Sequence, residues 1–429
     1  MNRLPSPALS RRGFVKAAVA LGGASALSAC LAREAPDLPT GPEDLSSLPD
    51  RQHAWNAALP TDAHGNDVAP RHRVVLLLDY ARDGAPTDAD RETTETALRS
   101  LERAYPRSHD DEVGLLFTVG YSPAYFERFD EALPGSVDLQ EPRALAPFEE
   151  PKLDRPDATV HLASDYGSVV LAAEAALLGE RDELNGRPAD ASLDGVFELA
   201  ERRTGFVGTG LPADHQDVAG IPDSKPVADD APLFMGFKSG FRKNQASEER
   251  VTIQDGPFAG GTTQQLSLLR LHLEQWYDQD SRHHRVATMF CPAHADEGLV
   301  EGTGENLGDA SLMEERGCPM HTERDARESG VVGHSQKSAR AREDGSPVIL
   351  RRDFDSTDGE EASLHFLSLQ RGVGDFVATR EAMNGTDLAG GAVGQRQNNG
   401  ILQYVTVERR GNYLVPPRRL RSLPPARPA

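Results

Sequence analysis

Short apolar runs of strand length alternate with stretches of helical spacing between residues 73 and 417. The first run, Arg73 to Tyr80, predicts a strand, and Asp88 to Tyr105 places apolar residues at helical spacing. The same criteria predict strands over residues 113–119, 158–163, 195–210, 262–271, 362–370 and 401–407, a strand or turn over 234–241, and helices over 122–129, 167–178, 273–278 and 373–383.

The order strand, helix, strand, strand, helix, strand occurs twice. In each copy a buried strand leads into a short helix with an aromatic anchor, Phe126 and Phe129 in the first and Phe376 in the second. The repeat predicts an α+β fold of two fused ferredoxin-like modules, of dimeric α/β-barrel type, over residues 71–230 and 231–420. Their antiparallel sheets would be covered by helices. Because such sheets often pair edge to edge or face to face, a homo-oligomer is a further expectation.

The N-terminal thirty residues have the pattern of an export signal. Arg11 and Arg12 lie in a twin-arginine motif, and the apolar run from Ala17 to Ala29 is too short to span a bilayer. The run ends in a lipoprotein-like box, with Cys30 as the lipid-bearing residue; the alternative is simple cleavage near Ala29. The prediction is export by the twin-arginine translocase and a lipid anchor on the outer face of the cytoplasmic membrane. Residues 31–70, which lack apolar periodicity, are predicted to be a flexible tether.

The charge balance is acidic, with 67 Asp and Glu against 46 Lys and Arg and a formal net charge of −21. Arginine strongly outnumbers lysine, and aromatic residues make up 6% of the chain. A dense acidic surface repels itself little in concentrated salt, which favours a halophilic, haloarchaeal source over an ordinary acidic secreted protein. No basic stripe is available to neutralise phosphates, so a nucleic-acid partner is excluded.

The least regular part of the chain, residues 279–348, contains two of its three cysteines and five of its 13 histidines. A loop of that length in a compact domain is usually functional. Two CPxH elements lie in it, at residues 291–294 and 318–321. Outside the cytoplasm Cys291 and Cys318 could form a disulfide. Alternatively, the two cysteines with His294 and His321 could bind zinc or copper, or the thiols could stay unpaired.

Several passages together resemble the dye-decolourising (DyP-type) haem peroxidase family. They are Leu116 to Phe126, Asp157 to Asp165, Met235 to Gly240 in the place of the family's GFxDG motif, Gly261 to Trp276, and Ile349 to Arg352 with His334 ahead of it. Their order covers most of the chain between residues 73 and 417.

The resemblance implies that haem b binds in the second module, with His334 as the proximal iron ligand and Asp387 as its hydrogen-bond partner. Arg351 matches the distal arginine, which polarises bound peroxide. The alternatives are a solvated loop histidine at 334, and at 351 a surface arginine or a partner of a haem propionate. Arg352 should point to the opposite face of its strand.

The sequence departs from the family at the aspartate of the GFxDG motif, which is Ser239 here. A hydroxyl has no pKa near neutrality and cannot act as a general base in the same way. The expected function is therefore an exported haem peroxidase that reduces hydrogen peroxide with an unidentified one-electron donor. The alternative is a non-enzymatic haem- or metal-binding surface lipoprotein of the same fold.

Overall fold

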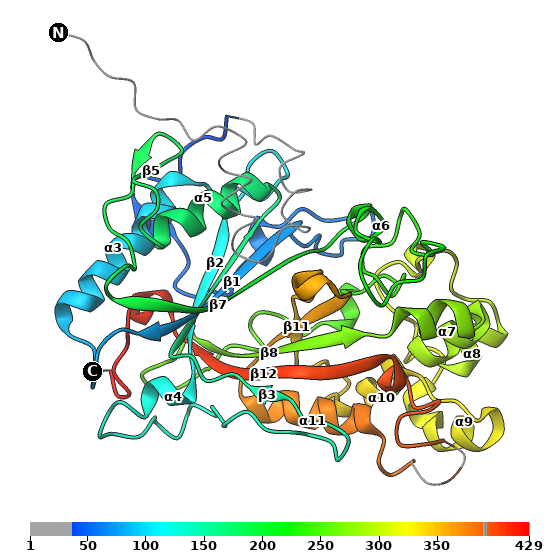
Figure 1. Cartoon of the computed structure of the whole chain (residues 1–429). Coiled ribbons are helices and arrows are strands. Elements are labelled where there is room, and N and C mark those ends of the chain that lie inside the picture. Colours follow the sequence, from blue (N-terminus) through cyan, green and yellow to red (C-terminus); the bar gives the residue numbers. More distant parts are fainter. Residues whose placement is uncertain (1–36, 389–390, 392, 429) are drawn as a thin grey trace.

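The computed structural model describes residues 37–388, 391 and 393–428 (Figure 1). The predicted export signal, Cys30 and residues 31–36 of the predicted tether lie outside the described residues. Eight strands of one large antiparallel sheet close into a barrel, in the order β7-β1-β4-β2-β12-β8-β11-β10, with β10 pairing back onto β7. They are β1 (His72–Tyr80), β2 (Leu116–Tyr121), β4 (Ala158–Ser164), β7 (Phe197–Phe206), β8 (Thr262–Leu271), β10 (Phe354–Ser356), β11 (Ser363–Gln370) and β12 (Val405–Val415).

The two halves of the chain contribute four consecutive strands each to the barrel. In both halves the spatial order is fourth, first, third and second strand. The halves meet at two narrow seams. Leu414 of β12 pairs with Tyr121 of β2 at one seam, and Asp355 of β10 pairs with Phe206 of β7 at the other.

Helices cover the outside of the barrel, and side chains fill its inside. Val74, Leu76 and Leu78 of β1 face the first-half helices α3 (Asp88–Ala104) and α5 (Gly167–Leu177). The alternate residues Val75 and Leu77 pack instead against β8 and β11 residues of the second half. Both faces of β1 are therefore buried, which is why its sequence is an almost continuous apolar run.

The second half carries α11 (Val373–Asn384) and most of the short elements (Figure 1). Residues 279–348, predicted to be irregular, contain four short α-helices: α7 (Arg282–Met289), α8 (Pro292–Asp296), α9 (Thr322–Ser329) and α10 (His334–Ser338). The remaining α-helices and strands of the described residues are α4 (Pro123–Phe126), α6 (Leu211–Asp214), β3 (Lys152–Leu153), β5 (Glu183–Leu184), β6 (Arg187–Pro188) and β9 (Leu350–Arg351). The last barrel strand begins at Val405 and runs to Val415, so its predicted bounds were wrong.

The prediction of a flexible tether is wrong for residues 37–70, which pack against the barrel. Trp55 is fully buried. The side-chain amide of Gln52 donates to the Val119 carbonyl (3.1 Å) and to the Pro416 carbonyl (2.8 Å), and its oxygen accepts from the Val119 N–H (2.9 Å). Gln52 therefore bridges β2 and the end of β12, where the two strands share only one pair.

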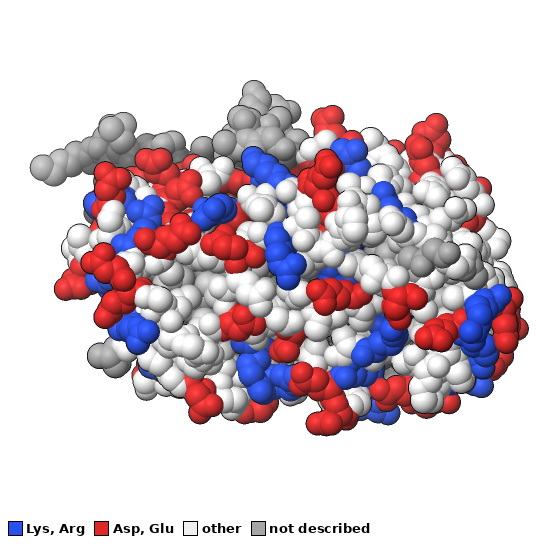
Figure 2. Space-filling model, turned by 90° about the horizontal axis from the view of Figure 1, so that it is seen from below, with Lys and Arg blue, Asp and Glu red and all other residues white. Residues whose placement is uncertain are grey.

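Acidic side chains are spread over the face shown in Figure 2, with basic side chains lying among them. This mixture agrees with the net charge of −21. Within the described residues, no helix has both the length and the apolar character needed to cross a membrane.

Candidate functional site

A cavity of about 230 Å³ lies on the outer face of the second-half sheet, beneath α10 and α11. Its walls are mostly apolar because alternate residues of three neighbouring strands point the same way. These are Leu269 and Leu271 of β8, Leu364 and Phe366 of β11, and Val405 and Val407 of β12. Phe376 and Met383 of α11 close the other side.

His334, the first residue of α10, lines this cavity. The residue before it must be glycine, because a Cβ at Gly333 would lie 1.6 Å from the Phe290 carbonyl oxygen. Nδ1 of His334 is buried and has no hydrogen-bond partner among the described residues. Burial, followed by the charge of Arg351, lowers the pKa of His334 to about 3. The imidazole is therefore neutral at physiological pH, the form that can bind a metal.

Arg351 lines the same cavity from the end of β9. Its backbone N–H donates to the side chain of Gln245 (3.0 Å), and β9 pairs with β11. Arg352 points to the other side, where its guanidinium lies 4.2 Å from the Trp55 ring centre and donates to the His53 carbonyl. The prediction that Arg351 and Arg352 point to opposite faces of the strand is confirmed.

Two carboxylates of the cavity wall, Asp353 and Asp355, were not predicted from the sequence. Asp353 lies 3.8 Å from the Arg351 guanidinium, and its other oxygen accepts from the Leu367 N–H. Burial raises its pKa to about 6. The sequence could have indicated both carboxylates, because every second residue of an extended segment points to the same face, and residues 351, 353 and 355 follow that spacing.

Ser239 also lines the cavity. It lies between Lys238, which pairs with Asp62 and Glu305, and Gly240, which has a φ of +79°. The segment thus keeps the glycine turns of the motif, while its hydroxyl replaces the expected carboxylate.

The predicted hydrogen bond between Asp387 and His334 is absent from the described structure, so that prediction was wrong. Asp387 is exposed and accepts two hydrogen bonds from Arg340 (2.5 and 3.3 Å). The Asp387 carboxylate therefore has its hydrogen-bond partners at the surface, in Arg340, and not in the imidazole of His334.

Arg380 of α11 and Arg410 of β12 form a charged edge of the cavity. Both donate to the buried carboxylate of Glu149, at 2.6 and 2.8 Å. Glu149 belongs to the long crossing between α4 and β4 in the first half. Sequence analysis did not find this cluster, because isolated arginines are common throughout the chain.

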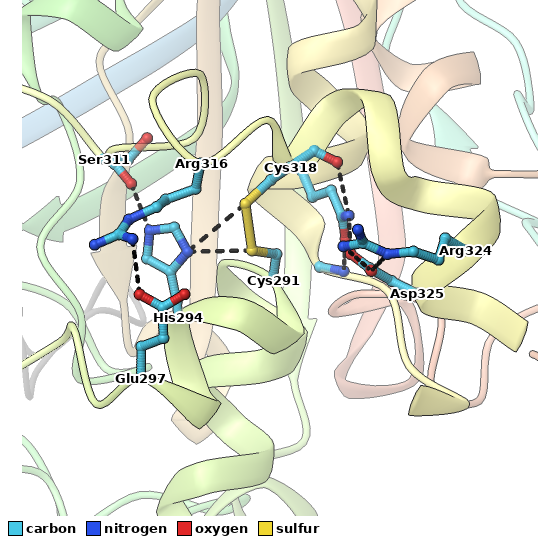
Figure 3. Close-up of a disulfide and its surroundings, with 10 residues drawn as sticks. Cys291, His294, Glu297, Ser311, Arg316, Cys318, Arg324 and Asp325 are labelled. Atoms are coloured by element: carbon cyan, nitrogen blue, oxygen red, sulfur yellow. Dashed lines mark hydrogen bonds and ion pairs between the residues drawn. A yellow bond between two sulfur atoms is a disulfide. The ribbon is translucent and has the colours of Figure 1, made fainter. Parts of the chain in front are cut away.

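The two CPxH elements meet in a disulfide between Cys291 and Cys318 (Figure 3). His294 lies against both sulfurs, with Nδ1 3.1 Å from the sulfur of Cys291 and 3.8 Å from that of Cys318. His321 does not join the three clustered side chains, so the predicted four-ligand set is reduced to Cys291, His294 and Cys318. Its ring lies against Gly317 instead.

Asp353→Asn is expected to stabilise the cofactor-free protein at neutral pH. A folded-state pKa of about 6 lies above the ordinary value, so the stability associated with protonated Asp353 is complete below about pH 4 and is lost as the pH rises through 6. Two pKa units correspond to about 3 kcal/mol. Denaturant unfolding between pH 4 and 8 should show a difference from the wild type that grows by up to about 3 kcal/mol as the pH rises.

The matched control for this prediction is Asp344→Asn, an exposed residue with a φ of +48°, a conformation that asparagine also adopts. This variant should unfold like the wild type at every pH. An equal difference at pH 4 and pH 8 for Asp353→Asn would contradict the raised pKa.

Comparison with known proteins identifies the fold. A model described as "Family of unknown function (DUF7405)" matches residues 70–417. No curated protein matches the chain. A dye-decolorizing protein from V. cholerae is 13% identical, with 86% of this chain and 98% of that chain covered and a TM-score of 0.52. A putative DyP-type peroxidase from Shewanella oneidensis is 15% identical, with coverages of 82% and 94% and a TM-score of 0.54.

A third similar structure is a variant of DypB from Rhodococcus jostii in complex with heme. It is 14% identical, covers 86% of this chain and 97% of that chain, and has a TM-score of 0.54. At such identities the likeness establishes the fold and not the chemistry. The chain belongs to the DUF7405 family of unknown function, and it has the fold of the DyP-type peroxidases.

Proposed function

We propose that this chain binds haem b in the second-half cavity through His334 and reduces hydrogen peroxide at the expense of a one-electron donor. The observation that carries the proposal is that a neutral imidazole and an arginine line one apolar cavity. A known structure of the same fold is a complex with heme, which supports this choice of cofactor.

The residues present fit the group. The strand residues and Phe376 offer apolar walls for a flat macrocycle, and Arg380 and Arg410 offer cations for its carboxylates. His334 would supply the nitrogen that binds iron. Its buried Nδ1 has no carboxylate partner among the described residues, so it lacks the second hydrogen bond that makes a ligand imidazole more basic.

Haem, when bound, would supply the iron at which peroxide is reduced. Arg351 provides a fixed positive charge where negative charge develops as the O–O bond breaks. Asp353, 3.8 Å from Arg351, takes over the proton transfer that Ser239 cannot perform. Its pKa of about 6 suits a group that accepts a proton from peroxide and returns it to the leaving oxygen.

The proposal extends to the parts of the chain around the site. The shared strand order supports two fused ferredoxin-like modules, with a boundary near residue 230. The twin-arginine pattern and Cys30 support export and a lipid anchor, and the acidic composition supports a halophilic source. Zinc or copper is proposed for a separate site, at Cys291, His294 and Cys318.

The test is a visible spectrum of the purified protein after addition of haem. The wild type should bind one haem per chain with a Soret band, and His334→Ala should lose the iron–histidine signature and most of its affinity. His283→Ala, an exposed histidine that contacts Asp296, is the matched control and should bind like the wild type. A His334→Ala protein with an unchanged spectrum would refute the ligand assignment.

A haem-binding protein without turnover is the second candidate, and Ser239 in place of the motif aspartate favours it. Steady-state oxidation of a one-electron dye by peroxide separates the two. Turnover that falls in Asp353→Asn supports the enzyme, whereas haem binding with no turnover in the wild type supports the carrier.

A further inference from the structure

The cluster of Cys291, His294 and Cys318 lies outside the cavity, and the proposed haem and peroxide chemistry does not use it. The two sulfur atoms and Nδ1 of His294 all lie within 4.8 Å of one another, and all three side chains are buried. Cys291 and His294 lie one turn apart at the start of α8, while Cys318 begins the short turn Cys318–His321 (Figure 3). The donors therefore come from two segments that are distant in the sequence.

The hydrogen bond on the far side of His294 fixes its tautomer. Nε2 lies 2.9 Å from the carbonyl oxygen of Ser311, which can only accept, so Nε2 carries the proton. Nδ1 then directs a lone pair at the two sulfurs. A disulfide sulfur has no proton to donate, so this buried lone pair has no donor while the disulfide is closed.

The hydrogen bond from Nε2 of His294 to the Ser311 carbonyl is typical of metal-binding histidines. In such residues one ring nitrogen binds the metal and the N–H of the other donates to a carbonyl or a carboxylate. The N···S separations of 3.1 and 3.8 Å lie on either side of the roughly 3.6 Å that zinc bond lengths and a tetrahedral angle require. The ring also stacks on Phe290, at 5.6 Å between centres and 14° between planes, which holds its orientation.

The charge of the reduced cluster indicates which kind of cation it would bind. Two thiolates and a neutral imidazole carry a charge of −2, which a divalent ion neutralises, and a neutral complex costs least in a buried site. Two charged groups that act on His294, Arg316 and Glu297, already pair with each other at 2.8 Å. Thiolate and imidazole ligands with this charge favour Zn²⁺.

We propose that Cys291, His294 and Cys318 form a redox-gated zinc site, closed as a disulfide under oxidising conditions and able to bind Zn²⁺ when reduced. Reduction by a phosphine and water converts the disulfide into two thiols and the phosphine into its oxide. Binding of Zn²⁺ then releases the two thiol protons, as sulfur–zinc bonds replace the sulfur–hydrogen bonds. Water takes the fourth position.

The experiment compares the oxidised and the phosphine-reduced full-length protein in their binding of Zn²⁺ alone. The reduced protein should bind one equivalent tightly and the oxidised protein none. Co²⁺ in place of Zn²⁺ should add the sulfur-to-cobalt absorption band that marks thiolate ligands. His294→Ala should weaken binding at least about tenfold, and Cys318→Ser should abolish the cobalt band.

Cys30→Ser and His283→Ala are the controls, because they remove the third cysteine of the chain and an exposed histidine of α7. Both should bind Zn²⁺ like the wild type. Equal binding before and after reduction, or reduced wild type that binds no zinc while its circular dichroism is unchanged, would overturn the proposal. Neither result depends on haem, so the outcome is independent of the peroxidase assignment.

Discussion

Replacing Arg351 with leucine is expected to lower kcat/KM for peroxide by about 10²–10³-fold and to leave haem bound. The guanidinium lies in the cavity wall with Asp353 3.8 Å away, and no other arginine lies that close to this carboxylate in the described structure. Removing it takes away the fixed charge that favours cleavage of the O–O bond. Steady-state kinetics and the Soret band of the same preparation measure the two effects separately.

Two further variants sharpen this prediction. Arg351→Lys keeps the charge but loses the planar fork, so its turnover should lie between those of the wild type and the leucine variant. Arg340→Leu removes an arginine that pairs with Asp387 outside the cavity and should leave turnover unchanged. If Arg351→Leu retains full turnover, the charge that stabilises the transition state comes from another group.

Glu149→Gln is expected to reduce the free energy of unfolding by about 3–5 kcal/mol, because it removes the carboxylate from a buried ion cluster. Both Arg380 and Arg410 donate to Glu149, and both arginines are buried. The amide would leave two guanidinium groups without a counter-charge. Urea or guanidinium unfolding of the cofactor-free protein at pH 7 measures the loss.

The pH dependence of that loss identifies its cause. Burial opposes ionisation of Glu149, but Arg380 and Arg410 together lower its pKa. The stabilisation is therefore complete above the ordinary glutamate pKa of about 4.3 and is lost as the pH falls through the lower folded value. Glu150→Gln changes the exposed neighbour and should have little effect at any pH. A destabilisation equal in both variants would refute the cluster as its source.

The barrel strands that the sequence predicted well contain runs that are mostly apolar. β1 and β8 lie within a residue of their predicted bounds, because Val74 to Leu78 in β1 and Leu266 to Leu269 in β8 are largely apolar and are buried or partly buried. β12 was missed over half its length because Arg409 and Arg410 interrupt the apolar pattern. Their charges are matched by Asp154, Glu201 and Glu149, partners that no local window contains.

The candidate site was also predicted only in part, because contacts between residues distant in the sequence cannot be read from the sequence. The resemblance to the peroxidases led to His334 and Arg351, which do line one cavity. Asp387 was wrongly assigned because an exposed ion pair with Arg340 holds it elsewhere, a contact that sequence spacing cannot reveal. Asp353 could have been found from alternation along the extended segment after Arg351, but a lone aspartate there is indistinguishable from a strand-end surface residue.

The hydrogen bonds of Gln52 make residues before position 70 part of the folded barrel. The family match begins at residue 70, but Gln52 supplies the partners of the Val119 N–H and carbonyl at the narrow junction between the halves. A protein trimmed to the matched region would leave that stretch of β2 with unpaired backbone groups. Such a free edge accepts strands from other molecules, so expression designs based on the family limits alone would favour aggregation over a closed monomer.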